Sequence, residues 1–396
     1  MQKAHKNVTV LAACQALLMT NNVILIALNA LAGYALADNK ALATLPITTY
    51  VVGAALTTIP ASLMMKYVGR RTGFMTGAAA GLVGALICSW GIYTANFWLL
   101  CFGTLVMGMY NAFGQYYRFA AADAASESFK SRAISLVLAG GIVGGVLGPE
   151  SSKWTKDLLP IDFLGSYLSL VVLSMAAMLL ITLIDIPGLS KSERNERGRP
   201  LLTIMAQPVF LVAALGAMIG YGVMNLLMTV TPLAMGHHHH PYSDAALVIE
   251  WHVIGMFAPS FFTGSLIQRF GVLNVMLTGV VLMFACVGIA VSGTALMNFW
   301  TALLLLGMGW NFLYVGGTTL LTESHRPAEK AKTQGANDFL VFVAMALSSI
   351  TSGALLDQAG WQAMNYWALP FLAAVAAAIF WFKLQRSQVS VTDLRG

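Results

Sequence analysis

Two pairs of potential metal ligands stand at helical spacing in the second half of the chain. Met224 and Met228 are four residues apart, and so are His252 and Met256. Residues four apart lie on one face of an α-helix, so each pair would present two ligands about 6 Å apart. Thioether sulfur selects Cu(I), whereas Zn prefers thiolate and imidazole, and Mn or Mg prefers oxygen. The spacing therefore indicates a site for a soft monovalent metal ion.

Core packing is the alternative explanation for these four residues. The chain contains 21 Met, and Met commonly fills gaps in helical cores. The matching depths of the two pairs favour the metal site. At 1.5 Å per residue, Met228 and His252 would lie about 11–12 Å from the intervening loop, and Met224 and Met256 about 17–18 Å. Two layers of ligands could then face each other near the middle of a membrane.

The segment that joins the two pairs contains four consecutive histidines: His237, His238, His239 and His240. Short His-rich tracts bind transition metals. We expect this tract to face the outside, where it would collect metal ions above the paired ligands. A solvated polar loop and an inserted tag are the alternatives, although a tag usually has six histidines and sits at a chain end.

The composition predicts that membrane helices position these residues. Hydrophobic residues make up 58% of the 396 residues, charged residues only 10%, and the mean hydropathy is +0.74. Runs long enough to cross about 30 Å of hydrocarbon occur twelve times, and each must be a helix because lipid cannot satisfy a polar backbone. We therefore expect an all-α membrane protein. The predicted spans are 8–33, 43–65, 73–94, 97–119, 132–152, 162–186, 205–234, 245–267, 272–293, 296–321, 333–356 and 362–383.

The basic residues predict how these spans are oriented. With the N-terminus in the cytoplasm, all but three of the 22 Lys and Arg fall on the cytoplasmic side, and the exceptions are Lys40, Lys153 and Lys156. Cytoplasmic loops carry such an excess. We expect both termini to be cytoplasmic, in a bacterial inner membrane. The net charge of +6 then reflects topology within the lipid bilayer, and no nucleic-acid partner is expected.

The two halves of the chain repeat at an offset near 200 residues. Asn111 corresponds to Asn311, and Gly69 corresponds to Gly271. The most polar stretch, KSERNERGRP, falls between spans six and seven. We predict an N-terminal six-helix bundle (1–190), a cytoplasmic linker (191–204) and a C-terminal six-helix bundle (205–396). In transporters built from such repeats, the substrate site lies between the halves.

This plan resembles the major facilitator superfamily across essentially the whole chain. The family carries a G-x-x-x-D-R-x-G-R-R motif after its second helix, and here Ser62, Gly69, Arg70 and Arg71 match it, while Lys66 replaces the acid. The second copy after span eight runs from Gly264 through Arg269 to Gly271. The resemblance implies two six-helix bundles that move against each other. It also makes Arg70, Arg71 and Arg269 candidates for gating.

Two acidic residues inside the spans are candidates for proton coupling. Glu150 lies near the outer end of span five, where a solvated mouth is the alternative. Asp338 lies near the inner end of span eleven, where pairing with Lys332 or a neighbouring helix is the alternative. Ionisable groups at membrane depth are costly, so each is a functional candidate.

The order and spacing of Met224, Met228, His252 and Met256 resemble the copper-binding motifs of the CcoA-type bacterial copper importers. The resemblance implies that all four are copper ligands. It also implies that the chain imports copper, as Cu(I), by alternating access and supplies assembly of the cbb3-type cytochrome oxidase. The copper would leave to a cytoplasmic chaperone or a thiol acceptor. Copper would be the transported substrate, so no cofactor is expected, and the family expectation is a monomer.

Import of riboflavin or another small organic solute is the main alternative, because the same subfamily includes riboflavin transporters. Export with the same ligands and a sensor role remain further alternatives. An enzyme is not expected, since the sequence contains no nucleophile–base pairing, hydrolytic metal motif or cofactor fingerprint.

Overall fold

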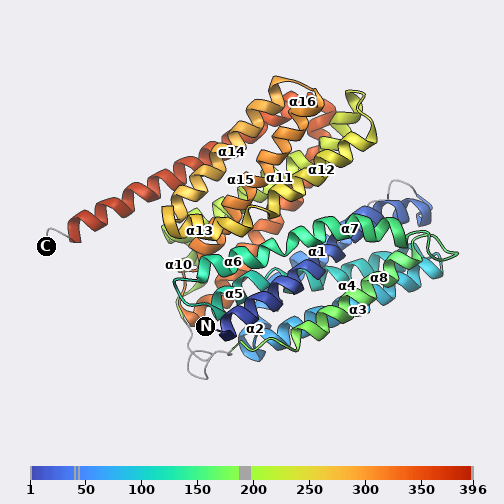
Figure 1. Cartoon of the computed structure of the whole chain (residues 1–396), viewed down its shortest axis with the longest axis horizontal. Coiled ribbons are helices and arrows are strands. Elements are labelled where there is room, and N and C mark those ends of the chain that lie inside the picture. The colour runs from blue at the N-terminus through green and yellow to red at the C-terminus, as the bar shows by residue number, and fades with distance from the viewer. Residues whose placement is uncertain (1, 40–41, 43–44, 187–197, 394–396) are drawn as a thin grey trace. The chain divides into compact units, whose positions relative to one another are not determined.

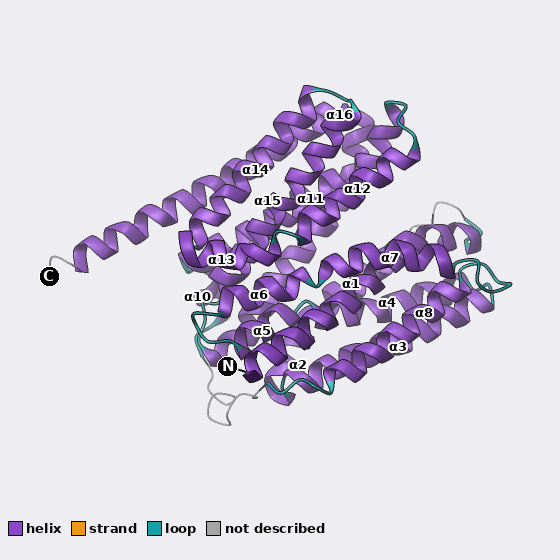
Figure 2. Ribbon diagram, in the orientation of Figure 1, coloured by secondary structure: helices purple, strands orange, loops and turns teal. Residues whose placement is uncertain are grey.

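The chain is an all-α protein over the residues that the structure describes. This computed structural model describes residues 2–39, 42, 45–186 and 198–393. Figures 1 and 2 show helices joined by loops, with no strand in those ranges. Hydrocarbon offers no hydrogen bonds to a backbone, so a chain this apolar satisfies its N–H and C=O groups within helices.

Contacts divide the chain into two compact units. The first comprises Met1–Arg197 with Gln334–Phe339, and the second comprises Gly198–Thr333 with Leu340–Gly396. The short segment Gln334–Phe339 thus belongs to the first unit, although it stands in the second half of the sequence.

The domain boundaries predicted from the sequence differ from the limits of these two units. The division into bundles 1–190 and 205–396 stays a prediction. Residues 191–197 of its linker (191–204) lie outside the described residues.

The first unit is a set of long helices, two of which are interrupted. A span covering Phe97–Ala124 breaks at Gln115–Tyr116, and a span covering Lys130–Thr155 breaks at Gly140. Its helices are α1 (Gln2–Leu36), α2 (Leu45–Val68), α3 (Arg70–Tyr93), α4 (Phe97–Gly114), α5 (Tyr117–Ala124), α6 (Lys130–Ala139), α7 (Gly141–Thr155) and α8 (Leu164–Ile181).

The second unit is interrupted at different places. Its helices are α10 (Leu201–Met205), α11 (Pro208–His237), α12 (Tyr242–Phe257), α13 (Ser260–Phe270), α14 (Val272–Ser292), α15 (Leu296–Leu321), the 3₁₀ turn η2 (Pro327–Glu329) and α16 (Lys330–Asp393). A bend of 40° separates α12 from α13, since Pro259 has no N–H to continue the helix. Within α16, Gly360 has φ 76°, so two helical segments meet there.

Ten helices in the described residues are long and apolar enough to cross a membrane, or eleven if the bent α12–α13 pair is one span. The chain is therefore a multi-pass membrane protein, as predicted. The remaining predicted span, 333–356, is helical as the first part of α16, and its early turns carry Gln334, Asn337 and Asp338. The total of twelve spans and the cytoplasmic position of the termini stay predictions.

Tight turns at equivalent places in the two units contain glycine. Gly69 separates α2 from α3 with φ 86°, and Gly271 separates α13 from α14 with φ 84°. Positive φ is open to glycine and strained for residues that carry a Cβ. These two glycines are the pair that the sequence repeat aligned.

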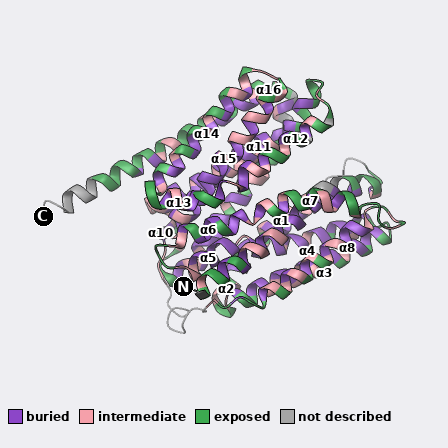
Figure 3. Cartoon of the chain, viewed as in Figure 1, coloured by how far each residue is buried: buried purple, intermediate pink, exposed green. Residues whose placement is uncertain are grey.

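Both buried and exposed residues occur along the helices (Figure 3), and large apolar side chains are found in both classes. Ile24, Leu28 and Leu100 are buried in a core of the first unit. Leu56 and Leu179 are about 70% exposed (69% and 71%). Exposed leucines on spanning helices fit a surface whose solvent is lipid rather than water.

Candidate functional site

His252 is fully buried on α12 and is held by α15. Its Nδ1 lies 2.7 Å from the carbonyl oxygen of Leu303. A carbonyl only accepts, so Nδ1 carries the hydrogen and Nε2 presents its lone pair. That Nε2 is buried and has no hydrogen-bond partner among the described residues. The hydrogen bond to Leu303 therefore fixes the orientation of the imidazole between α12 and α15.

The neighbouring ligand candidate, Met256, is fixed by the same helix. A Cβ at Gly307 of α15 would lie 2.5 Å from the carbonyl oxygen of His252, so only glycine permits this approach. Asn311 of α15 donates to the carbonyl oxygen of Met256 at 2.7 Å and to the hydroxyl of Ser260 at 2.5 Å. The His252–Met256 face of α12 is thus occupied in joining α12 to α15.

The other predicted ligand pair lies on α11. Met224 is buried and Met228 is half-buried. Within the described residues, no three His, Cys, Asp or Glu side chains come close enough to hold a metal ion. The assignment of Met224, Met228, His252 and Met256 as metal ligands stays a prediction, and core packing accounts for the contacts of the α12 pair.

The His tract links the end of α11 to α12. His239 adopts a positive φ of 62°, and His240 donates from Nε2 to the carbonyl oxygen of Thr294 at 2.8 Å. His237 and His238 are exposed and line a hollow of about 430 Å³. The metal-capture role of His237, His238, His239 and His240 stays a prediction.

The three arginines predicted to act in gating have different surroundings. The buried Arg70 donates to Asp123 of α5 at 3.0 Å and to Gln334 at 2.8 Å. Arg71 is exposed. Arg269 is also exposed, and its guanidinium lies 5.2 Å from the ring centroid of Phe270. Of the three, Arg70 alone forms an ion pair among the described residues, and it does so although Lys66 replaces the acid of the family motif. The gating role of Arg70, Arg71 and Arg269 stays a prediction.

The two acidic candidates also differ. Glu150 pairs with Lys153 at 2.6 Å in an exposed position. Asp338 pairs instead with Arg118 of α5, and both side chains are at most 3% exposed. Lys332, which the sequence offered as a partner of Asp338, donates to the carbonyl oxygen of Arg199. Among the described residues of the first unit, Asp338 is therefore the buried acid. The coupling roles of Glu150 and Asp338 stay predictions.

Five side chains of the first unit form a continuous hydrogen-bonded chain, called here the amide chain: Tyr50, Asn22, Asn111, Gln115 and Arg118. Tyr50 donates to Asn22, and Asn22 donates to Asn111 at 3.2 Å. Gln115 donates to Asn111 at 3.2 Å, and Arg118 donates to Gln115 at 3.0 Å. The amides come from α1 and from the end of α4.

The second unit contains an aromatic cluster of Tyr221, Phe257, Trp310 and Tyr314. Trp310 and Tyr314 are stacked, with ring centroids 4.9 Å apart and an interplanar angle of 19°. Tyr221 meets both edge-on at 5.2 and 5.3 Å, and Phe257 lies 5.8 Å from Trp310. Sequence reasoning missed this cluster, although Trp310 and Tyr314 stand four residues apart on one helix face.

One polar atom of the aromatic cluster is unsatisfied. The Nε1–H of Trp310 is buried and has no hydrogen-bond partner in the described part of the chain. Buried donors are normally paired, and an exception calls for an explanation such as a ligand. Aromatic faces and edges bind planar rings by stacking, and amides offer donors and acceptors together.

The family of the chain follows from its sequence, and solved structures match its fold. The family model of the Major Facilitator Superfamily matches residues 11–249 and 213–394. The chain belongs to this superfamily of transporters, in keeping with the predicted inner-membrane location. The fold matches the fucose:proton symporter FucP of E. coli with a TM-score of 0.78 at 17% identity, covering 97% of this chain and 99% of that one. The proton:xylose symporter XylE gives a TM-score of 0.80 at 12% identity, covering 96% of both chains.

Two relatives are similar over most of their length. The riboflavin transporter RfnT of Brucella anthropi is 41% identical over 375 residues, which cover 94% of both chains. The uncharacterized transporter YddS of Bacillus subtilis is 26% identical and covers 90% of this chain and 86% of its own.

The similarity to a riboflavin transporter overturns the prediction of copper import and of membership in the CcoA-type importers. The prediction failed because a Met pair at helical spacing looks the same whether its thioethers bind metal or fill a core. The imidazole of His252 likewise has a packing role between α12 and α15. The prediction of a transporter in the superfamily is correct.

Proposed function

We propose that the chain imports riboflavin, or a closely related flavin, across the bacterial inner membrane. The observation that carries the proposal is the 41% identity with a riboflavin transporter over 94% of both chains. Identity at this level over the whole length includes the helices that would line a substrate path. The copper ion, a copper chaperone and a thiol acceptor are no longer needed as partners.

The chemistry of riboflavin supports the proposal. Riboflavin joins a flat tricyclic ring, whose edge carries alternating donors and acceptors, to a chain of hydroxyl groups. In the second unit, the aromatic cluster contains the buried Trp310, whose Nε1–H has no hydrogen-bond partner among the described residues. The amide chain of the first unit offers the donors and acceptors of Asn22, Asn111 and Gln115. Ligand pockets commonly combine aromatic walls with a few placed polar groups.

The proposal includes the finer features of the fold. We infer twelve spans, with the two segments of α16 on either side of Gly360 as the last two, and both termini in the cytoplasm. The bundles 1–190 and 205–396 would then rock about the linker 191–204 in alternating access, and the chain would act as a monomer. Cysteine accessibility at positions near either terminus, probed with a membrane-impermeant reagent, tests the orientation.

The first experiment measures riboflavin uptake in a bacterial strain that cannot synthesise it. Cells that express the chain should accumulate riboflavin and grow at low external concentrations where cells with an empty vector do not. Equal uptake with and without the chain, at verified membrane expression, would overturn the proposal. Cell copper, measured by elemental mass spectrometry in the same cultures, should not change.

A matched pair of tryptophan variants then tests the aromatic cluster. Trp310→Phe removes the unpaired Nε1–H and part of the stacking surface, so uptake at limiting riboflavin should fall roughly tenfold, since one ring stacked on an aromatic side chain contributes about 1–3 kcal/mol. Trp361 is also buried in the second unit, but its Nε1 donates to the carbonyl oxygen of Ala290 at 3.0 Å. Trp361→Phe should therefore spare uptake at matched expression.

A further inference from the structure

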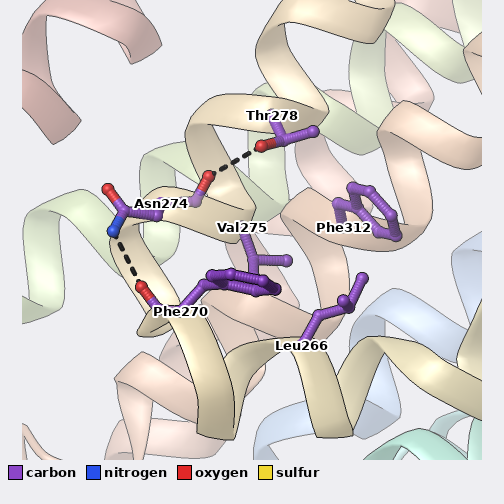
Figure 4. A pocket seen from close by; sticks show the side chains of 6 residues that line it. All are labelled: Leu266, Phe270, Asn274, Val275, Thr278 and Phe312. Carbon is purple, nitrogen blue, oxygen red and sulfur yellow. Dashed lines mark hydrogen bonds between the residues drawn. The ribbon is translucent and has the colours of Figure 1, made fainter.

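A shallow hollow of about 470 Å³ lies along α13 and α14 of the second unit, and we call it the α13–α14 groove. It is lined by Leu266, Phe270, Asn274, Val275, Thr278 and Phe312 (Figure 4). Phe270, Asn274 and Thr278 are exposed, and Phe270 keeps 51% of its surface. Because α13 and α14 belong to spanning segments, the open side of this apolar groove faces acyl chains rather than water.

Two basic side chains are attached to the lining of the α13–α14 groove. The guanidinium of Arg269 lies over the ring of Phe270. Lys383 of α16 donates to Oδ1 of Asn274 at 2.6 Å. Asn274 is itself fixed, because its Nδ2 donates to the carbonyl oxygen of Phe270 at 2.7 Å (Figure 4). The groove therefore has an apolar wall and two cations near one end.

The charges of these two cations are not neutralised within the protein. Over the described residues, no carboxylate lies within ion-pair distance of Arg269 or Lys383. Arg386, one turn further along α16, differs from these two residues because it forms an ion pair with Glu323. The neutral amide of Asn274 positions the ammonium group of Lys383 but leaves its charge available.

We propose that the α13–α14 groove binds an anionic phospholipid. The acyl chain would pack against Leu266, Val275 and Phe312, and the phosphate would bind Arg269 and Lys383. Basic pockets between membrane helices bind acidic lipid headgroups in this way, and guanidinium matches phosphate geometry with two donors. A free phosphate ion would make no use of the apolar wall. A zwitterionic lipid would bring a third cation to the two already present. This inference does not depend on the transported solute.

Native mass spectrometry of the purified full-length chain tests the proposal. The protein in detergent would be titrated with phosphatidylglycerol or with phosphatidylcholine of the same acyl composition. The wild-type protein should retain phosphatidylglycerol in preference to phosphatidylcholine. The double variant Arg269→Gln/Lys383→Gln should lose that preference by roughly thirtyfold, since each basic residue near an anionic headgroup contributes about a factor of five. Thr278→Phe, which fills the groove without changing charge, should weaken both lipids.

The matched control removes two exposed cations of the first unit. Lys6→Gln/Arg132→Gln loses the same charge away from the groove and should bind both lipids as wild type does. Equal retention of the two lipids by wild type would overturn the proposal, as would an undiminished preference in Arg269→Gln/Lys383→Gln. A wild-type elution profile on size exclusion shows that the variants are folded.

Discussion

The two units repeat each other in sequence, but their helices break at different places. In the first unit, the span that ends in α5 is interrupted at Gln115–Tyr116, whereas the equivalent α15 is continuous. In the second unit, α12 and α13 separate at Pro259, whereas α2 runs unbroken through Pro60. A proline therefore does not decide by itself where a membrane helix ends. Whether the helix continues depends on which neighbouring side chains can form hydrogen bonds with the backbone groups that the proline leaves without a partner.

The repeat-related Asn111 and Asn311 illustrate the difference. The side chain of Asn311 makes its hydrogen bonds around the break between α12 and α13. It donates to Met256 and Ser260 and accepts from Thr263 at 2.7 Å. Asn111 instead accepts from Asn22 and Gln115 within the amide chain. The same residue type at the same repeat position thus braces one unit and supplies polar side-chain groups in the other.

The largest expected effect concerns the buried ion pair of the first unit. Arg118→Gln leaves the carboxylate of Asp338 buried without its cation, which should destabilise the protein by about 3–5 kcal/mol. The midpoint of thermal unfolding in detergent measures the loss. The double variant Arg118→Gln/Asp338→Asn removes both charges and should recover most of it. A double variant no more stable than Arg118→Gln would contradict the ion-pair explanation.

The asparagine pair gives the next effect. Asn311→Leu removes the donor to the carbonyl of Met256 and to the hydroxyl of Ser260, so stability should fall by about 2–4 kcal/mol. Compared with Asn311→Leu, the variant Asn111→Leu should lose more riboflavin uptake and less stability. Thermal unfolding and uptake, measured on both variants at matched expression, separate the two roles. If the variants lose stability and uptake in the same proportion, the contrast between a structural role for Asn311 and a transport role for Asn111 is wrong.

A smaller effect compares the ion pairs at the start of each unit. In the second unit, fully buried Glu329 accepts from Arg199 at 2.6 Å, and this bonding with Arg199 holds the pKa of the carboxyl well below its usual range. In the first unit, Lys3 and Asp185 form an exposed pair. Glu329→Gln should lower stability by on the order of 2 kcal/mol at pH 7. Lys3→Gln should have no measurable effect.

The pH dependence of this effect has a definite sign. Folding lowers the pKa of Glu329. Its carboxylate therefore contributes fully to the free energy of unfolding above the ordinary carboxyl pKa of about 4.3, and this contribution is lost as the pH falls below that value. The gap in unfolding midpoint between wild type and Glu329→Gln should thus be constant from pH 8 to pH 5 and shrink at lower pH. A gap that widens on acidification would show that the carboxylate is not the stabilising form.

The smallest expected effect concerns the methionines of α11. Met228→Leu conserves volume, and Met224→Leu does the same at a buried position, so riboflavin uptake should stay within about twofold of wild type. The same uptake assay measures both variants. A tenfold loss with unchanged expression would instead give these thioethers a direct role in transport.

Much of the fold could be predicted from the sequence, and the site could not. Apolar runs gave the spanning segments, and the repeat aligned Gly69 with Gly271, both of which have positive φ. The partner of Asp338 was not predictable, because Arg118 lies 220 residues away. The cluster around Trp310 was missed because aromatic residues are frequent in membrane spans.

The sequence alone determined that this protein is a helical membrane protein, because hydrocarbon imposes helices on any chain with such long apolar runs. It also showed the internal repeat. Only the tertiary structure decided which polar side chains are consumed in packing. The amide of Asn311 is fixed between α12 and α15, while Nε2 of His252 and the Nε1–H of Trp310 have no hydrogen-bond partner among the described residues. Hydrogen bonds between distant segments make that distinction, and residue spacing within one helix does not reveal them.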